Sequence, residues 1–399
     1  MNNENKKKIL VLTPRYPFPV IGGDRLRIYK ICEELAKDYE LTLLSFCDKA
    51  EEMQIPYDAK VFSEVHRVYL PKNKSRINVL RALFSQTPLQ IAYYWSKEYK
   101  DKIDQLLPAH DATLSHLIRV GDYVKNKSGL HFLEMTDAIS LNYKRVKEKA
   151  SIFNLKTLVY AFEQSRLERY ERKINNKFKV TALVSPVDAA YLYPENPENV
   201  IVCGNGVDTI NLPYKTRTVD KNKAINLVFI GNMHSLQNMD GVRWFSKEIL
   251  PYLNKHSDYT FKFKVIGRVA EKDRKWLEVQ DNIIVTGEVD DVSIAASEGH
   301  FGVCPIRLGA GIQNKILEYM ALGLPCITSG VGFEGLGAEN GKSIYIADNT
   351  KDYLNRLNQL INNPEEYNHI AVNAKIFVDE NFSWSAKLSN FVLKIKESI

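Results

Sequence analysis

Short apolar runs alternate with longer segments whose apolar residues recur at helical spacing through the first half of the chain. Such runs are typical of buried strands, and the helical spacing is typical of amphipathic helices. The runs predict strands over Lys8–Thr13, Glu40–Cys47, Val65–Leu70, Ala112–Ser115, His131–Met135, Val180–Ser185 and Val200–Val202. The spacing predicts helices over Asp24–Lys37 and Asn154–Asn175. Strands that alternate with helices predict a parallel sheet covered on both faces.

The same alternation starts again in the second half. Strands are predicted over Asn226–Ile230, Phe261–Ile266, Ile283–Thr286, Phe301–Pro305, Pro325–Ser329 and Ser343–Ile346. Helices are predicted over Met239–Tyr252, Gln313–Leu322 and Thr350–Asn362. The turn Gly204–Asp208 and the polar stretch Lys215–Asn226 separate the two halves. We therefore expect two Rossmann-like domains, residues 1–205 and 206–380, and a closing helix within residues 381–399, around Trp384.

Composition excludes several classes of protein. A chain of 399 residues is long enough for two domains, and 45% apolar with 26% charged residues is typical of globular proteins. No apolar run approaches the ~20 residues of a membrane-spanning helix. The five cysteines are scattered, which argues against a disulfide framework or a zinc site and fits a reducing cytoplasm. The motifs G-x-S-x-G and H-E-x-x-H are absent, so neither a serine nucleophile nor a metal pair is indicated.

The net charge of +6 is concentrated in the first half, in the segments Lys72–Arg81 and Lys144–Lys179. The second segment interleaves cations with large apolar residues such as Phe162. Such a segment can dock on anionic lipid, or it can be an amphipathic helix with a solvated face. No signature of a nucleic-acid-binding module accompanies the charge.

The most informative stretch is Gly309–Pro325, in which a small-residue turn leads from a buried strand into a helix. This arrangement directs free backbone N–H groups and the positive end of a helix at an anion. Lys315 and Glu318 are three residues apart, so they share one face of that helix. A cation beside a phosphate and a carboxylate beside hydroxyl groups would suit a sugar nucleotide. A surface turn with an intrahelical Lys–Glu pair is the alternative interpretation.

Other candidate residues follow predicted strands, where ligands of open α/β sheets bind. Gly22 and Gly23 offer bare backbone to a phosphate or a sugar. His116 can act as a base, bind a sugar hydroxyl or be structural, and Asp137 can bind a hydroxyl or cap a helix. In the second half the corresponding candidates are Asn232, after the first strand, and the cations Arg268 and Arg307.

Three segments carry a resemblance to a known family. They are Leu183–Asp188, Val200–Asp208 and Glu318–Pro325, the last of which matches the pattern E-x-M-A-x-G-x-P. With its two predicted domains, the chain resembles family 4 of the glycosyltransferases over nearly its whole length. It is most similar to the branch with a G-x-G-x-x-x-K turn. Members of this family are retaining enzymes of the GT-B fold.

The resemblance implies two Rossmann-like domains that face each other across a cleft, with the closing helix crossing back onto the N-terminal domain. That domain would bind the acceptor, and the C-terminal domain would bind the nucleotide sugar. The resemblance assigns phosphate binding to Gly309, Gly311 and Lys315, and the donor ribose to Glu318. His116 and Asp137 would face the donor sugar or the acceptor, and Gly22 and Gly23 would approach both substrates.

The chain departs from the family pattern at three positions. Ala310 stands where many members have a first glutamate, and Asn232 and Asn238 stand where many have Arg and Lys for the diphosphate. Arg268 and Arg307 are the candidates to compensate for this missing charge.

The expected activity is transfer of a sugar, with retention, from a nucleotide diphosphate to a hydroxyl of a glycan or lipid-linked glycan. Capsule or O-antigen synthesis at the inner face of the plasma membrane is the expected setting, in the cytoplasm and without a metal or other cofactor. Two alternatives stay open: a sugar-nucleotide epimerase of the same architecture, and a non-catalytic protein that binds a nucleotide or glycan.

Overall fold

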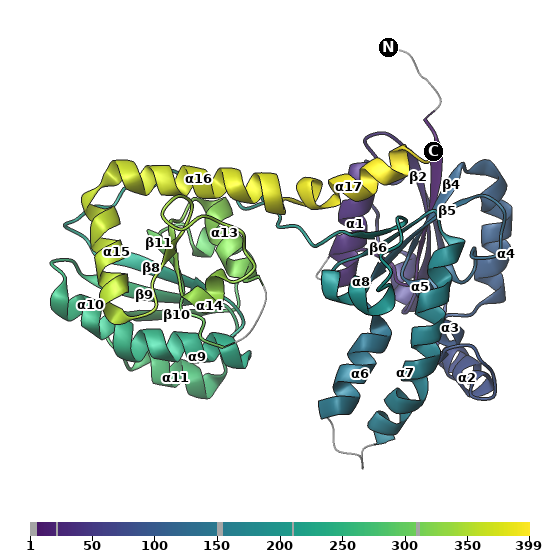
Figure 1. Ribbon diagram of the computed structural model, residues 1–399, viewed down its shortest axis with the longest axis horizontal. Helices are drawn as coiled ribbons and strands as arrows, with labels where there is room; N and C mark the ends of the chain where they lie inside the picture. The colour runs from purple at the N-terminus through teal and green to yellow at the C-terminus, as the bar shows by residue number, and fades with distance from the viewer. Residues whose placement is uncertain (1–5, 21–22, 150–154, 210, 309–311) are drawn as a thin grey trace. The chain divides into compact units, whose positions relative to one another are not determined.

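The chain folds into two compact units, which we call the N-terminal and C-terminal domains (Figure 1). The N-terminal domain comprises Met1–Asn205 with Lys387–Ile399, and the C-terminal domain comprises Gly206–Ala386. The computed structural model describes residues 6–20, 23–149, 155–209, 211–308 and 312–399. The candidate residues Gly22, Gly309, Ala310 and Gly311 lie outside these ranges.

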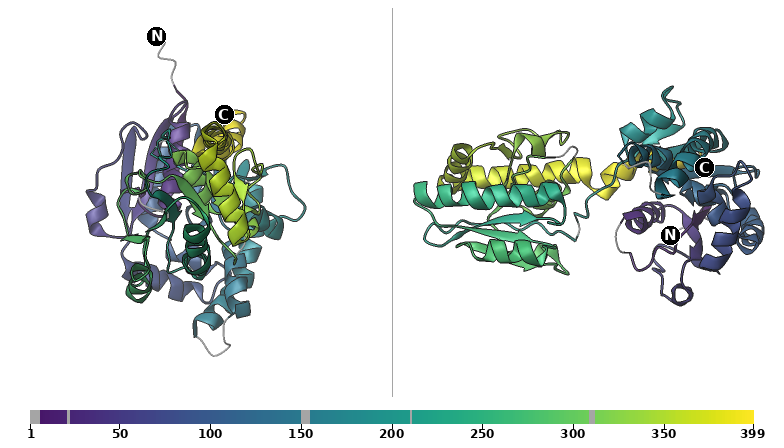
Figure 2. Two further views of the ribbon diagram at one scale, coloured as in Figure 1. Left: turned by 90° about the vertical axis from the view of Figure 1, so that its left-hand side faces the viewer. Right: turned by 90° about the horizontal axis from the view of Figure 1, so that it is seen from below.

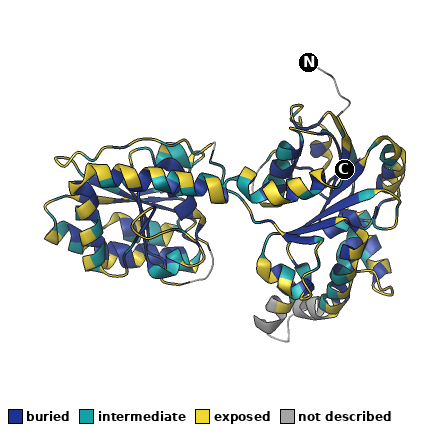
Figure 3. Ribbon diagram, turned by 45° about the horizontal axis from the view of Figure 1, so that its top comes forward, coloured by how far each residue is buried: buried dark blue, intermediate teal, exposed yellow. Residues whose placement is uncertain are grey.

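The N-terminal domain is built on a seven-stranded parallel sheet in the order β3-β2-β1-β4-β5-β6-β7. The strands are β1 (Lys8–Thr13), β2 (Glu40–Cys47), β3 (Glu64–Tyr69), β4 (Ala112–His116), β5 (Leu130–Thr136), β6 (Val180–Leu183) and β7 (Val200–Val202). Their ends lie within two residues of the predicted ones, because strands buried on both faces are continuous apolar runs. The strands are largely buried, as their dark blue colour shows in Figure 3.

Helices cover both faces of this sheet. They are α1 (Gly23–Leu35), α2 (Lys72–Ala82), α3 (Leu89–Tyr93), α4 (Lys97–Leu106), α5 (Ile118–Gly121), α6 (Ile139–Lys149), α7 (Leu155–Ile174), α8 (Pro186–Leu192) and α17 (Trp384–Lys396), which enters this domain at Lys387. Leu10 and Leu12 of β1 pack in the core cluster of α3, α4, α5 and α7. The end of α17 is tied to the loop after α1 by an ion pair of 2.5 Å between Lys396 and Asp38.

The C-terminal domain has a six-stranded parallel sheet in the order β10-β9-β8-β11-β12-β13, which lies between helices (Figure 2). The strands are β8 (Ile225–Ile230), β9 (Phe261–Ile266), β10 (Ile283–Gly287), β11 (Phe301–Cys304), β12 (Cys326–Thr328) and β13 (Tyr345–Ile346). The helices are α9 (Leu236–Trp244), α10 (Leu250–His256), α11 (Glu271–Glu278), α12 (Val292–Ala295), α13 (Asn314–Leu322), α14 (Gly330–Phe333), α15 (Thr350–Asn362) and α16 (Pro364–Phe382).

One predicted helix is not regular. The segment predicted over Met239–Tyr252 consists of α9, a π-helical turn at Phe245–Ile249 and α10. Pro251 lies in the first turn of α10 and has no N–H to donate to the preceding turn, so the hydrogen-bond pattern changes just before it.

Both sheets share one topology, and it defines where ligands can bind. In each sheet the strand order reverses beside the first strand, between β1 and β4 and between β8 and β11. Ligands of such sheets bind beyond the carboxyl ends of the strands at this switch point. Both domains are therefore Rossmann-like α/β units with a parallel sheet, as the sequence predicts.

Candidate active site

Helix α13 is fixed against the switch point of the C-terminal sheet by Tyr319. The Tyr319 hydroxyl accepts a hydrogen bond of 2.9 Å from the Ile230 N–H and donates one of 3.2 Å to the Val303 carbonyl. A Cβ atom at Gly302 would lie 2.3 Å from the Tyr319 ring, so this glycine lets the helix lie close to β11. Gly323 ends the helix in the left-handed conformation, at φ 71°. The start of α13 is thereby held at the carboxyl ends of β8 and β11.

Lys315 lies in the first turn of α13 and is only 8% exposed. Its Nζ donates a hydrogen bond of 2.9 Å to Gln313 Oε1 and lies 5.5 Å from the centre of the Phe229 ring. Burial lowers the pKa of Lys315, and the nearby carboxylate of Glu318 opposes that effect. A cation in this setting lacks full solvation, so it gains from an anionic ligand.

Glu318 lies one turn further on and is partly buried. Desolvation raises the pKa of Glu318 to about 7, against the opposing charge of Lys315. Within the described residues the carboxyl group has no hydrogen-bond or ion-pair partner, and Lys315 bonds Gln313 instead. Burial of the lysine and the missing ion pair do not fit the alternative of a surface Lys–Glu pair.

The loop after β8 is packed tightly through two glycines and an asparagine. Gly267 has φ 127°, and a Cβ atom there would lie 1.9 Å from the Gly231 carbonyl oxygen. The side-chain amide of Asn238 donates a hydrogen bond of 2.9 Å to the Asn232 carbonyl. Asn238 Oδ1 is buried without a partner in the described structure. The two asparagines therefore hold the backbone of this loop. They supply amide groups at the positions where many members of the family have the cations Arg and Lys.

The two candidate arginines of this domain are both paired with carboxylates. Arg268 forms an ion pair with Glu288 in which both side chains are exposed. Arg307 forms two hydrogen bonds with Asp240, of 2.8 and 3.1 Å, and lies 5.1 Å from the Trp244 ring. An exposed pair such as that of Arg268 contributes little to stability, so Arg268 is free to exchange its partner for a phosphate. Arg307 is held more firmly.

In the N-terminal domain, His116 and Arg27 share the buried carboxylate of Glu134. His116 Nδ1 lies 2.6 Å from Glu134 Oε2, and Arg27 Nε donates to Glu134 Oε1 at 2.7 Å. Burial by itself would raise the pKa of Glu134, but the Arg27 charge and the His116 hydrogen bond outweigh it and hold the pKa at about 2. Arg27 also donates to the carbonyl of Cys203, at 2.8 Å. Arg27 thus links α1 to β5 and to Cys203, directly after β7.

The charge on Glu134 determines the tautomer of His116. An ionised carboxylate only accepts hydrogen bonds, so the proton of this contact is on Nδ1. Nε2 of a neutral ring is then an acceptor, and it is buried without a partner in the described residues. His116 can therefore accept a proton or a hydroxyl hydrogen bond through Nε2.

The backbone is strained at the carboxyl ends of β4 and β5, where His116 and Glu134 lie. Leu117, directly after His116, has φ 70°, and Thr136, two residues after Glu134, has φ 64°. Non-glycine residues in this conformation are costly and gather at functional sites. Asp137 follows and is exposed, and partial desolvation together with the carboxylates of Asp188 and Glu134 raises its pKa.

Gly23, at the start of α1, leaves open space beside the backbone. Its φ is 35°, and apart from its chain neighbours and its own helix backbone, no heavy atom of the described residues lies within 4 Å of the position that a Cβ atom would take. The structure thus places Gly23, His116 and Asp137 at the carboxyl edge of the N-terminal sheet. Asn232, Arg268, Lys315 and Glu318 occupy the corresponding edge of the C-terminal sheet.

Sequence reasoning missed two residues of these clusters. Arg27 lies on a helix whose apolar stripe was recognised, but its partners Glu134 and Cys203 are 107 and 176 residues away. Gln313 lies two residues before Lys315. A side-chain amide so close to the predicted phosphate-binding lysine could have indicated a hydrogen bond between them.

Comparisons with known proteins agree with this geometry. Residues 224–363 match the family model "Glycosyl transferases group 1", which spans the candidate site of the C-terminal domain. The chain is 23% identical over 406 residues to an uncharacterised 44.6 kDa protein in the cps region of Klebsiella pneumoniae, covering 97% of this chain and 99% of that protein.

Solved structures share the whole fold. A glycosyltransferase from Rickettsia africae aligns with a TM-score of 0.62 at 14% identity, over 98% of each chain. HepE of Anabaena, solved in complex with UDP and glucose, aligns with a TM-score of 0.55 at 14% identity, over 98% of this chain and all of its own. These chains share the GT-B fold, and the family model that matches residues 224–363 indicates a glycosyltransferase domain in the C-terminal half of the chain.

Proposed function

We propose that this enzyme transfers a sugar, with retention, from a nucleoside diphosphate to a hydroxyl of a glycan or lipid-linked glycan. The observation that carries the proposal is the buried Lys315 beside Glu318, whose carboxyl group has no hydrogen-bond or ion-pair partner among the described residues. They lie at the switch point of the domain that matches the glycosyltransferase family model. A nucleoside diphosphate provides both a phosphate for the lysine and ribose hydroxyls for the carboxylate.

Lys315 and the start of α13 are proposed to stabilise the leaving diphosphate. As the glycosidic bond to phosphate breaks, negative charge builds on the phosphate oxygens, and a preorganised cation lowers the barrier to that step. Arg268 can join by exchanging Glu288 for phosphate, because both side chains are exposed. UDP is the first nucleotide to test, since HepE, which shares the fold, was solved with UDP and with UDP-glucose.

The N-terminal domain is proposed to bind the acceptor. His116, oriented by Glu134, accepts a hydrogen bond from a substrate hydroxyl through Nε2, and Asp137 lies on the adjacent strand end. In a retaining reaction the departing phosphate can take the acceptor proton, so neither residue has to be the base. Gly23 gives the substrates access to backbone at the start of α1.

Synthesis of a cell-surface polysaccharide, capsule or O-antigen, is the proposed setting. The relative in the cps region covers the chain almost end to end and supports this setting. Acceptors of such pathways are held at the inner face of the membrane. The enzyme is therefore proposed to work from the cytoplasm and to touch the membrane peripherally.

A patch around α2 supports this contact. None of the described helices is both long and apolar enough to span a bilayer. Yet α2 buries the small or polar residues Ser75, Asn78 and Ala82, whereas Leu80 is 61% exposed and Phe84, just beyond the helix, is 95% exposed. The same helix carries several cations. Exposed apolar side chains beside Lys and Arg are typical of helices that lie in a membrane interface. Of the second basic segment, Lys144–Lys179, residues 150–154 lie outside the described ranges.

Catalysis without a metal remains a prediction. In the part of the chain that the structure describes, no group of three His, Cys, Asp or Glu side chains is arranged to hold a metal ion. If Lys315 and the helix start meet the diphosphate charge, enzyme treated with EDTA transfers sugar at the untreated rate. A rate restored only by adding a divalent cation would contradict the prediction.

The proposal is tested by incubating the purified enzyme with UDP-, GDP-, dTDP- and ADP-sugars and membranes that contain lipid-linked glycans. Labelled sugar should move to the glycan, and the NMR coupling at its anomeric carbon should show the donor's configuration. An inverted product would contradict retention. Conversion of the nucleotide sugar without an acceptor would indicate an epimerase, and binding without turnover a non-catalytic protein.

A further inference from the structure

A pocket of about 500 Å³ lies at the switch point of the N-terminal sheet. Its four charged residues follow four neighbouring strands: Arg15 after β1, Asp48 after β2, Lys72 after β3 and Arg119 after β4. Helices α2 and α3 complete the wall. This volume lies within the ~300–1,000 Å³ of small-molecule sites, and the switch point is where such sites form.

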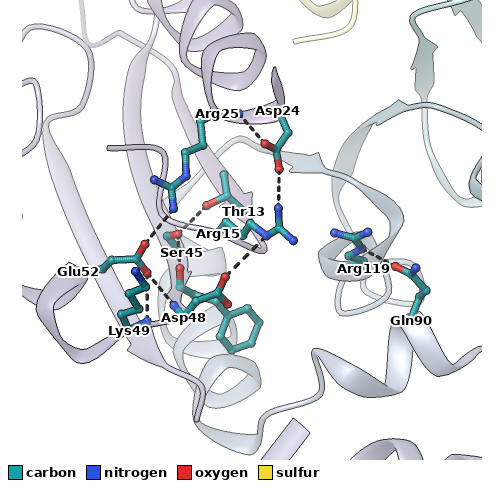
Figure 4. A network of polar contacts seen from close by, with 11 residues as sticks. Thr13, Arg15, Asp24, Arg25, Ser45, Asp48, Lys49, Glu52, Gln90 and Arg119 are labelled. Carbon is teal, nitrogen blue, oxygen red and sulfur yellow. Dashed lines mark hydrogen bonds and ion pairs between the residues drawn. The ribbon is translucent and has the colours of Figure 1, made fainter. Parts of the chain in front are cut away.

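The positive charge of this pocket is only partly compensated. Arg15 contacts Asp24 at 3.4 Å and Asp48 at 3.7 Å, as Figure 4 shows. Arg119 and Lys72 have no carboxylate within ion-pair distance among the described residues. The pocket therefore carries excess positive charge on the side formed by Arg119 and Lys72.

Arg119 is held so that part of its guanidinium stays available. Its Nε donates a hydrogen bond of 2.9 Å to Gln90 Oε1, and Gln90 in turn donates to the Tyr143 hydroxyl at 2.5 Å. The guanidinium lies 5.3 Å from the centre of the Tyr94 ring. With Nε occupied, the two terminal nitrogens form a fork that fits the two oxygens of a phosphate or a carboxylate.

The pocket also has an aromatic wall and lies close in sequence to the candidate acceptor-binding histidine. Tyr93 and Tyr94 line it, and such rings combine an apolar face with a polar tip, which suits the mixed surface of a sugar. Arg119, in α5, follows His116, the last residue of β4, by three residues. An anion on Arg119 would thus bring the rest of the ligand toward the end of β4, which carries His116.

We propose that this pocket binds an acceptor that carries a phosphate or carboxylate next to its sugar ring, with Arg119 and Lys72 as the anion-binding residues. This inference rests on the proposed function, because it names the chemical class of the acceptor. A neutral glycan would leave the two cations without a partner, so the pocket selects acidic or phosphorylated acceptors over neutral ones.

The test is calorimetric titration of the full chain with glucose 1-phosphate, glucuronic acid and neutral methyl glucoside. UDP at saturating concentration keeps these probes from the donor site. One or both anionic probes should bind at least tenfold more tightly than methyl glucoside, since hydrogen bonds to charged groups are the strong ones. Which of them binds distinguishes a phosphorylated from an acidic acceptor.

Variants assign the effect to the pocket. Arg119→Ala and Lys72→Ala should each weaken binding of the anion about tenfold or more. Arg119→Lys should restore it only in part, because the fork is lost. Lys100→Ala, which removes an exposed charge outside the pocket, should bind like the unchanged chain. All variants should keep their affinity for UDP.

Three results would overturn the inference: equal binding of methyl glucoside and both anions, unchanged binding by Arg119→Ala, or no binding of either anion at millimolar concentration. Failure of UDP to bind would instead count against the proposed donor, and the anion titrations, repeated without UDP, would still report on this pocket.

Discussion

At the scale of single residues, the candidate donor site is a place where a charged group is kept at a cost to stability. Lys315 and Glu318 are both desolvated, with shifts that disfavour their charged forms. Burial of such groups without direct pairing is unfavourable unless a ligand compensates for it. The pair therefore suits a binding site better than it suits a structural role.

Replacement of Glu318 should reveal this cost through pH. The pKa of Glu318 is raised from its ordinary 4.5 to about 7, so its contribution to stability is present below pH 4.5 and is lost as the pH rises through 7. Glu318→Gln should then be more stable than the unchanged chain at pH 8, by roughly 1–3 kcal/mol, and similar to it at pH 5. Urea unfolding at both pH values measures the difference. The opposite result, in which Glu318→Gln loses stability relative to the unchanged chain as the pH rises from 5 to 8, would contradict this interpretation of Glu318.

The buried pair of Arg27 and Glu134 should behave in the opposite way. Both side chains are at most 1% exposed, so Glu134→Gln leaves an arginine charge in the interior and should cost about 3–5 kcal/mol. The pKa of about 2 means that the stability contributed by Glu134 is present above pH 4.5 and is lost as the pH falls toward 2. The double variant Arg27→Met/Glu134→Leu serves as the control and should lose less stability than Glu134→Gln. Equal stability of Glu134→Gln and the unchanged chain would show that the pair does not hold the domain.

At the scale of elements, periodicity predicted the strands well and the polar networks poorly. A buried parallel strand is a continuous apolar run, and β1, β2, β7 and β9 begin and end where that run predicts. Helix α16 was not predicted, although its buried Tyr367, Ile370, Ala371 and Ala374 recur at helical spacing. The network of Arg27 joins residues more than a hundred positions apart, and no local pattern encodes such a contact.

The placement of α13 can be tested through Tyr319. Tyr319→Phe keeps the ring but leaves the buried Ile230 N–H without its acceptor, which should cost about 1–3 kcal/mol of stability. Because the same hydroxyl holds the helix that carries Lys315, affinity for UDP should fall as well. Thermal unfolding and UDP titration check the two effects. If Tyr319→Phe loses stability but keeps its affinity for UDP, the Tyr319 hydroxyl does not position the donor site.

At the scale of the whole molecule, each domain presents candidate residues at the switch point of its own sheet, and the exposed patch on α2 is the proposed membrane contact. Ser substitution of Leu80 and Phe84, which are exposed, should leave stability nearly unchanged but reduce sedimentation with vesicles that contain phosphatidylglycerol. Neutral phosphatidylcholine vesicles are the control and should bind less. Equal sedimentation of the variant and the unchanged chain would remove α2 from the membrane contact.

The central claim is that Lys315 binds the diphosphate of the donor, and calorimetric titration with UDP tests it most directly. Lys315→Met keeps the buried stem of the side chain and removes its charge, while Lys351→Ala removes an exposed charge elsewhere in the same domain. The account predicts that Lys315→Met stays folded and weakens UDP binding at least tenfold, and that Lys351→Ala binds UDP like the unchanged chain. A folded Lys315→Met variant with undiminished affinity for UDP would contradict the account.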